Sequence, residues 1–311
     1  MPFATVVIVN PQAGGGRARR LWPGLREALD VTVGTYATRW TTRPGEATEY
    51  ARTALRNGYD RVLAVGGDGT LNEVANGFFD GDAPIRPSAV LAPIGGGTGS
   101  DFRRSLGAAM PPDAAVRALL QDRFRTIDLG RLRYTAEDGR EATRYFVNIA
   151  SFGMGGAVDR VVQSLPAKRW LGGRLAYLYA ILHTLAHYTS PPVELSVDGV
   201  PRGTFRIRNV AIANGRFFGG GLKIAPCARL DDGRFDVVVL GDLTRRALLR
   251  HAPRFYRGTH TALHHVATMR GQRIVAAPAA DAPVRLDVDG EPLGRLPATF
   301  EIVPRALRIQ F

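Results

Sequence analysis

The sequence predicts a chain of two domains. The first is an α/β domain in which helices cover a parallel sheet, and the second is mainly antiparallel β. A length of 311 residues favours two domains over one. Apolar strands alternate with helices up to about residue 128, as in parallel α/β folds. Beyond that point, short β-branched runs are separated by Asp-Gly turns, which are typical of antiparallel hairpins.

In the first part, short apolar runs such as TVVIV at 5–9 predict strands, and apolar residues at helical spacing predict helices. Gly58 supplies a helix end. The expected strands are 5–9, 31–36, 61–65 and 88–92, and the expected helices are 17–29, 47–57, 70–76 and 113–121.

Three glycine-rich loops follow three of these strands, at 10–16 (NPQAGGG), 66–70 (GGDGT) and 93–101 (PIGGGTGSD). Carboxyl ends of parallel strands meet at one edge of a sheet, so these loops are expected to converge on a ligand site. Glycine permits positive φ and close approach of a ligand, and a helix N-terminus offers N–H groups to phosphate. Neither a P-loop nor a GxGxxG fingerprint is present.

Asp68 is the informative residue of the second loop. A carboxylate beside a polyphosphate would repel it, so a bound Mg²⁺ ion is the expected mediator. Taken alone, the pentapeptide fits a tight strand-to-helix turn equally well.

In the second part, strands are expected at 126–134, 145–149, 193–197, 204–207, 210–213 and 235–240. Helices are expected at 155–165, 174–188 and 243–257. The last of these is basic and amphipathic, and for it a solvated outer face is favoured over membrane contact.

The net charge of +13 favours anionic partners: nucleotides, nucleic acid or acidic membranes. No basic run with interleaved aromatic residues appears, so nucleic acid is not an expected partner. The single cysteine, Cys227, excludes an intrachain disulfide. Without a basic signal-peptide start or a long apolar run, the expected location is the cytoplasm.

Several motifs together resemble the diacylglycerol kinase catalytic domain family, which includes bacterial soluble lipid kinases, sphingosine kinases and ceramide kinases. They are 10–14 (NPQAG), 66–73 (GGDGTLNE), 97–102 (GTGSDF), 214–221 (NGRFFGGG), 231–236 (DDGRFD) and 289–291 (DGE). GGDGT alone is shared with NAD kinases. The third loop departs from the family pattern, because two extra residues precede Gly97 and Ser100 replaces an asparagine.

The resemblance implies an ATP-binding domain at 1–128 and a β-sandwich lipid-substrate domain at 129–311, with the last ~14 residues returning to the first. It implies transfer of the γ-phosphoryl group of ATP to the hydroxyl of a diacylglycerol or sphingoid-like lipid, presented at a membrane surface. It therefore implies a cytoplasmic protein that visits the inner face of the membrane, and it allows a homodimer. ATP is expected to contact Asn10, Pro11, Gln12, Ala13, Gly14, Thr41, Gly66, Gly67, Asp68, Gly69, Thr70, Leu71, Asn72 and Thr98.

Catalysis is expected from the segment around Asp289 and Glu291. In an extended strand, Asp287 and Asp289 point away from the face of Leu286 and Val288. Without the resemblance, an Asp-Gly turn with solvated acids would be favoured. With it, Glu291 is the expected base, assisted by Asp289, and Asp68 acts through Mg²⁺.

The resemblance also implies a structural Mg²⁺ at Arg229, Asp232 and Arg234, through the Asp232 carboxylate and two backbone carbonyls. An Asp-Gly turn without metal is the alternative there. For the whole chain, two other functions stay open: an NAD kinase-type phosphotransferase, and a catalytically silent lipid- or nucleotide-binding regulator. The joint presence of Asp68, Asp289 and Glu291 argues against the regulator.

Overall fold

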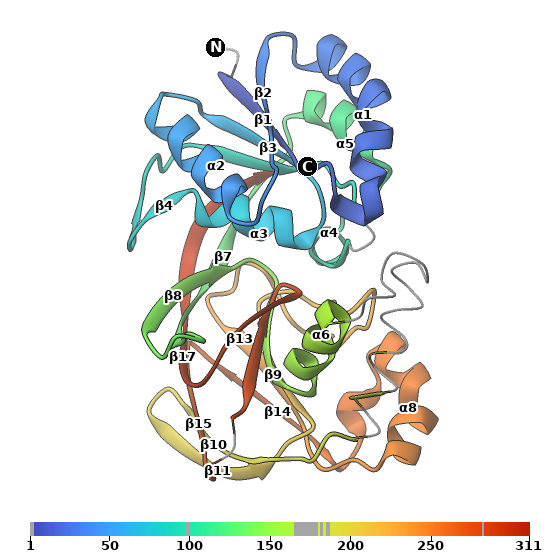
Figure 1. Ribbon diagram of the computed structural model, residues 1–311, viewed down its shortest axis with the longest axis vertical. Helices are drawn as coiled ribbons and strands as arrows, with labels where there is room; N and C mark the ends of the chain where they lie inside the picture. The colour runs from blue at the N-terminus through green and yellow to red at the C-terminus, as the bar shows by residue number, and fades with distance from the viewer. Residues whose placement is uncertain (1–2, 98–99, 165–179, 181–182, 185–186, 282) are drawn as a thin grey trace. The chain divides into compact units, whose positions relative to one another are not determined.

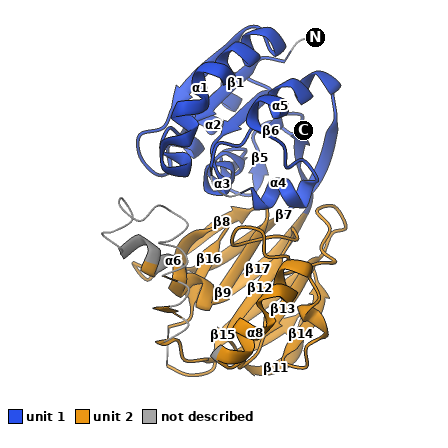
Figure 2. Ribbon diagram, turned by 90° about the vertical axis from the view of Figure 1, so that its right-hand side faces the viewer, with its two compact units in different colours: residues 1–129, 304–311 blue, residues 130–303 orange. Residues whose placement is uncertain are grey.

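A computed structural model describes the chain except for residues 1–2, 98–99, 165–179, 181–182, 185–186 and 282 (Figure 1). It divides into two compact units (Figure 2). Unit 1 comprises residues 1–129 and 304–311, and unit 2 comprises residues 130–303. The last eight residues therefore belong to the unit that the N-terminus begins.

Unit 1 is built on a parallel sheet in the order β17-β6-β3-β1-β2. The strands of this sheet are β1 (Thr5–Val9), β2 (Tyr36–Trp40), β3 (Arg61–Val65), β6 (Val90–Pro93) and the end of β17 (Glu291–Gln310). β1, β3 and β6 are buried along their whole length, which explains their continuous apolar runs. The predicted parallel α/β fold of the N-terminal part is confirmed.

Helices cover both faces of this sheet. The elements are α1 (Ala13–Thr32), α2 (Glu46–Arg56), α3 (Asp68–Asn76), α4 (Asp101–Leu106), α5 (Pro112–Ala118) and the 3₁₀ turn η1 (Leu119–Gln121), beside a small hairpin of β4 (Phe79–Asp80) and β5 (Ala83–Pro84). Leu25 and Leu29 of α1 and Val116 of α5 pack with alternate strand residues on one face. α2 and α3 lie on the other side (Figure 1).

The expected strand at 31–36 is wrong at its start. α1 continues to Thr32, with the N–H of Val33 still donating to the Leu29 carbonyl, and β2 begins only at Tyr36. Val31 is 87% exposed on the last helical turn. Burial of Leu29 on the same helix outweighs the strand preference of the β-branched pair at 31–32.

Unit 2 consists mainly of antiparallel strands, as predicted. One ladder runs β14-β13-β12-β9-β16-β17, and a second joins β17 through β15 and β10 to β11. The strands are β7 (Phe124–Thr135), β8 (Glu141–Phe146), β9 (Ile149–Gly153), β10 (Pro192–Val197), β11 (Val200–Arg206), β12 (Asn209–Ala213), β13 (Phe235–Leu240), β14 (Val266–Gly271), β15 (Arg273–Pro278), β16 (Arg285–Val288) and β17. Phe146, Phe152, Phe235 and Phe300 lie in the core between them.

The helices described in unit 2 are α6 (Met154–Ser164), α8 (Arg245–Arg257) and the turn η3 (His260–Ala262). Most of the helix expected at 174–188 falls outside the described residues. Within the part of the chain that is described, no helix combines the length and apolarity needed to cross a bilayer.

Candidate active site

The three glycine-rich loops converge in unit 1, as their positions after parallel strands predict. A Cβ atom added at Gly14 would lie 2.9 Å from the carbonyl oxygen of Gly96. A Cβ at Gly97 would lie 2.6 Å from Cα of Gly67, and the Gly97 N–H donates to the Gly66 carbonyl at 3.2 Å. The loops approach so closely that glycine is required at these contacts.

The first loop is tied to the second by Asn10, at the end of β1. Its side-chain Nδ2 donates to the Thr70 hydroxyl at 3.0 Å, and its Oδ1 accepts the Gln12 N–H at 3.0 Å. Pro11 and Ala13 complete this turn, and the glycines at 14–16 all have positive φ. Regular helix therefore starts at Arg17, although helical hydrogen bonding reaches back to Ala13.

The second loop leads into α3, whose N-cap is Gly67 and whose first turn holds Asp68, Gly69 and Thr70. The Thr70 side chain fills the space beside Gly66, where any Cβ would overlap it. Leu71 and Asn72 are buried, and the Leu71 N–H donates to the Gly67 carbonyl at 3.0 Å. Gly66 and Thr70 are buried as well, whereas Gly67, Asp68 and Gly69 are partly exposed.

Asp68 joins the second loop to the third. Its Oδ2 accepts the N–H of Asp101 at 3.1 Å, and its Oδ1 accepts the N–H of Phe102 at 3.4 Å. Ser100, the N-cap of α4, makes no capping bond with its own side chain. Asp68 thus caps α4 from outside the helix. A carboxylate at this place also fits a nucleotide-borne Mg²⁺ ion, because hard cations prefer carboxylate oxygens.

Arg103 anchors the third loop through hydrogen bonds to backbone carbonyls, a role that was not predicted from the sequence. The side chain is 6% exposed and donates to the carbonyl oxygens of Ile94, Ala108 and Met110. Burial lowers the pKa of the Arg103 guanidinium, and the Asp68 carboxylate opposes that shift. A side chain at Gly95, where φ is +71°, would overlap the guanidinium. In the sequence, the two extra residues before Gly97 were the only sign that the third loop is unusual. Thr98, which was expected to contact ATP, lies outside the described residues.

Thr41 lies at the end of β2, beside the end of β1. Its N–H donates to the Val9 carbonyl at 2.9 Å, and its hydroxyl lies 3.5 Å from the same oxygen. The neighbouring Thr42 hydroxyl is engaged by Glu46 at 3.0 Å. The backbone hydrogen bond from Thr42 is the largest cause that lowers the pKa of Glu46. Of the two threonines, Thr41 is the one adjacent to the first glycine-rich loop.

In unit 2, Asp289 is a buried clamp. It has a positive φ of 51° and follows β16, in which Leu286 and Val288 face the core as predicted. Its carboxylate accepts three backbone N–H groups, from Val147 at 2.9 Å, Asn148 at 3.1 Å and Ile149 at 2.9 Å. The alternative of an Asp-Gly turn with a solvent-exposed carboxylate is therefore wrong for Asp289, which is only 8% exposed.

Asn148 extends this clamp to the motif at 214–221. Its side chain donates to the Phe217 carbonyl at 2.8 Å, and its own carbonyl accepts the N–H groups of Asn214 and Gly215 at 2.9 Å. The Asn214 side chain returns a bond to the Val147 carbonyl at 2.9 Å. Two distant motifs thus meet on one short loop, a role of Asn148 that no local signal revealed.

Glu291, the first residue of β17, is more accessible. Its side chain is 35% exposed, and its Oε2 lies 3.1 Å from Nη2 of Arg144. Asp289 is therefore placed to position the loop, and Glu291 presents a carboxylate that Arg144 orients.

At the predicted second metal site, the carboxylates of Asp232 and Asp236 both interact with Arg270. Arg270 pairs with Asp232, and its Nε lies 3.3 Å from Oδ2 of Asp236, whose pKa is raised by burial. The Arg234 N–H donates to Asp232 Oδ1 at 3.3 Å, and Arg229 pairs with Asp231. Among the described residues, no three ligating side chains cluster. Asp232 therefore forms an ion pair with Arg270. The predicted site needs only one carboxylate and two backbone carbonyls, so the metal-binding role of these residues stays a prediction.

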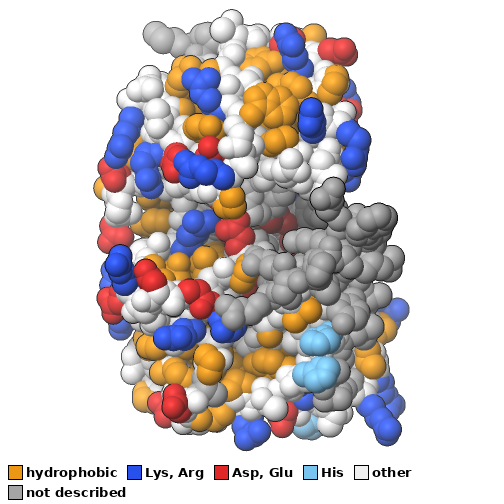
Figure 3. All heavy atoms as spheres, in the orientation of Figure 1, with side chains coloured by type: hydrophobic (Ala, Val, Ile, Leu, Met, Phe, Trp, Pro, Cys, Tyr) orange, Lys and Arg blue, Asp and Glu red, His pale blue; other side chains and the backbone are white. Residues whose placement is uncertain are grey.

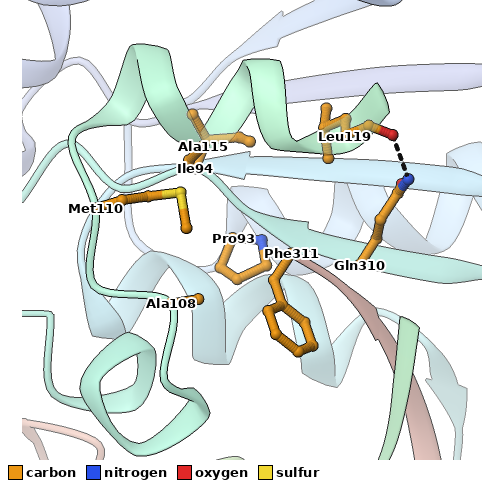
Figure 4. Close-up of a pocket in the computed structure, with 8 residues that line it drawn as sticks. All are labelled: Pro93, Ile94, Ala108, Met110, Ala115, Leu119, Gln310 and Phe311. Atoms are coloured by element: carbon orange, nitrogen blue, oxygen red, sulfur yellow. Dashed lines mark hydrogen bonds between the residues drawn. The ribbon is translucent and has the colours of Figure 1, made fainter. Parts of the chain in front are cut away.

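A small cavity in unit 1 borders the start of the third glycine-rich loop, at Pro93 and Ile94. Figure 4 shows its lining, in which the Gln310 side chain donates to the Leu119 carbonyl at 3.0 Å. The lining residues are Pro93, Ile94, Ala108, Met110, Ala115, Leu119, Gln310 and Phe311. Because no charged side chain lines this cavity, it is a gap in the packing between α5 and the C-terminal residues and not a phosphate site.

Residues 4–132 match the model of the diacylglycerol kinase catalytic domain, and residues 148–311 match that of the YegS C-terminal NAD kinase beta sandwich-like domain. The chain is 29% identical over 310 residues to the diacylglycerol kinase of Bacillus subtilis strain 168, covering 97% of this chain and 94% of that protein. It is 30% identical over 266 residues to the diacylglycerol kinase of Mycobacterium tuberculosis strain H37Rv, covering 85% and 81% respectively.

The fold is also that of a solved structure. A crystal structure of a diacylglycerol kinase from Bacillus anthracis strain Sterne matches with a TM-score of 0.71 at 21% identity, covering 100% of this chain and 98% of that chain. This match supports the fold of an α/β domain followed by a β-sandwich domain.

Proposed function

The chain belongs to the diacylglycerol kinase family of lipid kinases, and we propose that it transfers the γ-phosphoryl group of ATP to the hydroxyl group of a diacylglycerol or sphingoid-like lipid. The curated relatives from Bacillus and Mycobacterium are named diacylglycerol kinases, and each match spans most of both chains.

The observation that carries the proposal is the convergence of the three glycine-rich loops beside Asp68. Phosphoryl transfer depends mainly on positioning and on neutralising charge. Glycines at 14, 66–67 and 96–97 let the three loops pack against one another and leave their backbone open to a triphosphate, and the start of α3 offers a positive dipole end. Mg²⁺ bound with ATP would neutralise the phosphates, and Asp68 would hold it.

The acceptor hydroxyl needs a base, and Glu291 is the proposed one. Its carboxylate is partly exposed and oriented by Arg144, so it can accept a proton from a bound alcohol. Asp289 acts as a positioning residue, because its oxygens hold the N–H groups of the loop 147–149.

An NAD kinase-type activity is the second candidate. It is favoured by the GGDGT loop and by the match of residues 148–311 to a domain described as NAD kinase-like. The loop at 10–14 and the 289–291 segment (DGE) argue for the lipid kinase instead.

The test is transfer of label from [γ-³²P]ATP, with Mg²⁺, into a panel of micellar lipids and NAD. Glu291→Gln serves as the blank and Glu141→Gln, an exposed carboxylate of β8, as the matched control. We expect label in one lipid class with the wild type and the control, and loss in the blank with ATP binding retained. Label in NAD alone would establish the second candidate. ATP binding without transfer to any acceptor would favour a silent regulator.

A lipid acceptor places the reaction at a membrane surface, so we expect a cytoplasmic protein that contacts the inner face of the membrane transiently. Nucleic acid is not an expected partner. A homodimer is allowed by the family resemblance, and analytical ultracentrifugation of the full chain tests it.

A further inference from the structure

The outer face of α8 carries arginines interleaved with apolar side chains. Leu249 and Tyr256 are each 59% exposed, which is unusual for large hydrophobic residues of this protein. At helical spacing they share the exposed side of the helix with basic residues. Among the described side chains of α8, the exposed ones are Arg246, Leu249, Arg250, Pro253, Arg254, Tyr256 and Arg257, here called the α8 face.

The orientation of this face is set by packing on the opposite side. Phe255 is buried, and Leu248 packs against the same apolar cluster. The Thr244 side chain accepts the Ala247 N–H at 3.2 Å and starts the helix, and Gly258 ends it with a φ of 74°. Because both ends and the inner side are anchored, the α8 face points outward. In Figure 3, blue Lys and Arg side chains project at the lower right, where Figure 1 places α8.

Among the residues that the structure describes, the arginines of the α8 face have no acidic partner. α8 contains no acidic residue, and within the described residues no carboxylate pairs with Arg246, Arg250, Arg254 or Arg257. By contrast, α1 and α5 carry intrahelical pairs, such as Arg117 with Asp113.

Helix stability explains only part of this charge. Cations in the last turn interact well with the helix dipole, but Arg246 stands in the first turn, where a cation is unfavourable. The backbone N–H of Lys223 donates to the Phe255 carbonyl at 2.9 Å. The Lys223 side chain lies beside Gly258 and adds another cation near the end of α8. The helix dipole therefore accounts for Arg254 and Arg257 of the last turn, but not for Arg246 and Arg250.

We propose that the α8 face docks on an anionic phospholipid surface. Arginines would contact headgroup phosphates, while Leu249 and Tyr256 would enter the boundary between headgroups and acyl chains. The apolar residues decide between partners, because a surface for polyphosphate alone gains nothing from an exposed leucine. The proposal rests on the proposed function, since a lipid kinase meets its acceptor at a bilayer. It replaces the solvated outer face that the sequence alone favours.

The test is co-sedimentation of the full chain with phosphatidylcholine vesicles with and without phosphatidylglycerol. The variant is Arg246→Glu with Arg250→Glu. The matched control is Arg140→Glu with Arg202→Glu, which makes the same charge change at exposed residues outside α8. We expect the α8 pair to weaken partitioning to the anionic vesicles roughly tenfold or more, and the control pair to change it little. Leu249→Ser should weaken the binding that survives high salt.

Three results would overturn the docking surface: no binding of the wild type to anionic vesicles, equal losses in both pairs, or equal binding of duplex DNA with the same arginine dependence. Thermal unfolding of each variant shows that a loss is not unfolding. Phosphorylation of lipid in uncharged detergent micelles separates the two proposals. An α8 pair that keeps this activity but loses vesicles supports docking, and a wild type that binds vesicles through α8 without phosphorylating any lipid supports docking while rejecting the kinase function.

Discussion

The Oδ2 atom of Asp68 accepts the backbone N–H of Asp101 at 3.1 Å, which joins the second glycine-rich loop to the third. The residue proposed to hold the metal of ATP therefore also caps the short helix that follows the third loop. Removing its side chain disturbs two functions, and the choice of substitution decides which one an assay reports.

Asp68→Asn and Asp68→Ala are both expected to reduce phosphoryl transfer strongly, but they should lower the stability of the fold by different amounts. Asparagine keeps one oxygen to accept an N–H, whereas alanine leaves both α4 donors without it, so Asp68→Ala should lose about 0.5–2 kcal/mol of stability. Denaturant unfolding measures this difference. Mg²⁺ titration of residual activity in Asp68→Asn should show a raised requirement; an unchanged Mg²⁺ dependence would contradict the metal role.

Gly95→Ala is expected to destabilise unit 1 by about 1–3 kcal/mol, because it places a side chain at positive φ and against the Arg103 guanidinium. Gly107→Ala is the matched control: it has φ of +80° but open space around its Cβ. The difference between their unfolding midpoints isolates the contact with Arg103. Equal midpoints would show that the arginine gives way easily.

Glu291→Gln and Asp289→Asn should both lose turnover, with ATP binding largely kept, but only the second should lose stability. Replacing the carboxylate base by an amide should lower the rate about 10²–10⁴-fold. Asparagine at 289 cannot accept three N–H bonds, so Asp289→Asn should cost about 1–3 kcal/mol as well. Steady-state kinetics with thermal unfolding of the same samples checks both. Near-normal turnover of Glu291→Gln would remove Glu291 from catalysis.

Because of His260, we expect the protein to become less stable at acid pH. The ring is fully buried and stacks on Phe255, and its Nε2 lies 3.0 Å from the Ile224 carbonyl oxygen. Burial lowers the pKa of His260 below the ordinary value of 6.5. Below pH 6.5 the unfolded chain binds a proton that the folded chain does not, so stability falls with decreasing pH, by up to about 1.4 kcal/mol per unit. The loss levels off once pH passes the folded pKa.

Denaturant midpoints between pH 5 and 8 measure this slope. His260→Gln should flatten it, and His264→Gln, at an exposed position, should leave it unchanged. The same slope in both variants would assign the pH dependence to other groups.

Local sequence determined much of the architecture of this protein. The buried strands of unit 1 are apolar along their whole length, and glycine follows each where the chain turns, so strand, loop and helix could be assigned in order. Parallel order then implied that the loops meet, as the contact between Gly67 and Gly97 shows. Asp-Gly turns and β-branched runs likewise predicted the antiparallel strands of unit 2.

Tertiary structure alone decided what the polar side chains do. Asp289 binds backbone groups 140 to 142 residues away, and Asp68 binds some 33 residues away, so neither partner has a signal in the neighbouring sequence. Asn148 likewise binds the Phe217 carbonyl, 69 residues away. Arg103 binds carbonyls 5 to 9 residues away, but a backbone carbonyl is present in every residue and leaves no sequence signal. Periodicity records which side chains are buried, because burial repeats with the backbone, but the hydrogen-bond partner of a buried polar group is set only when distant loops come together.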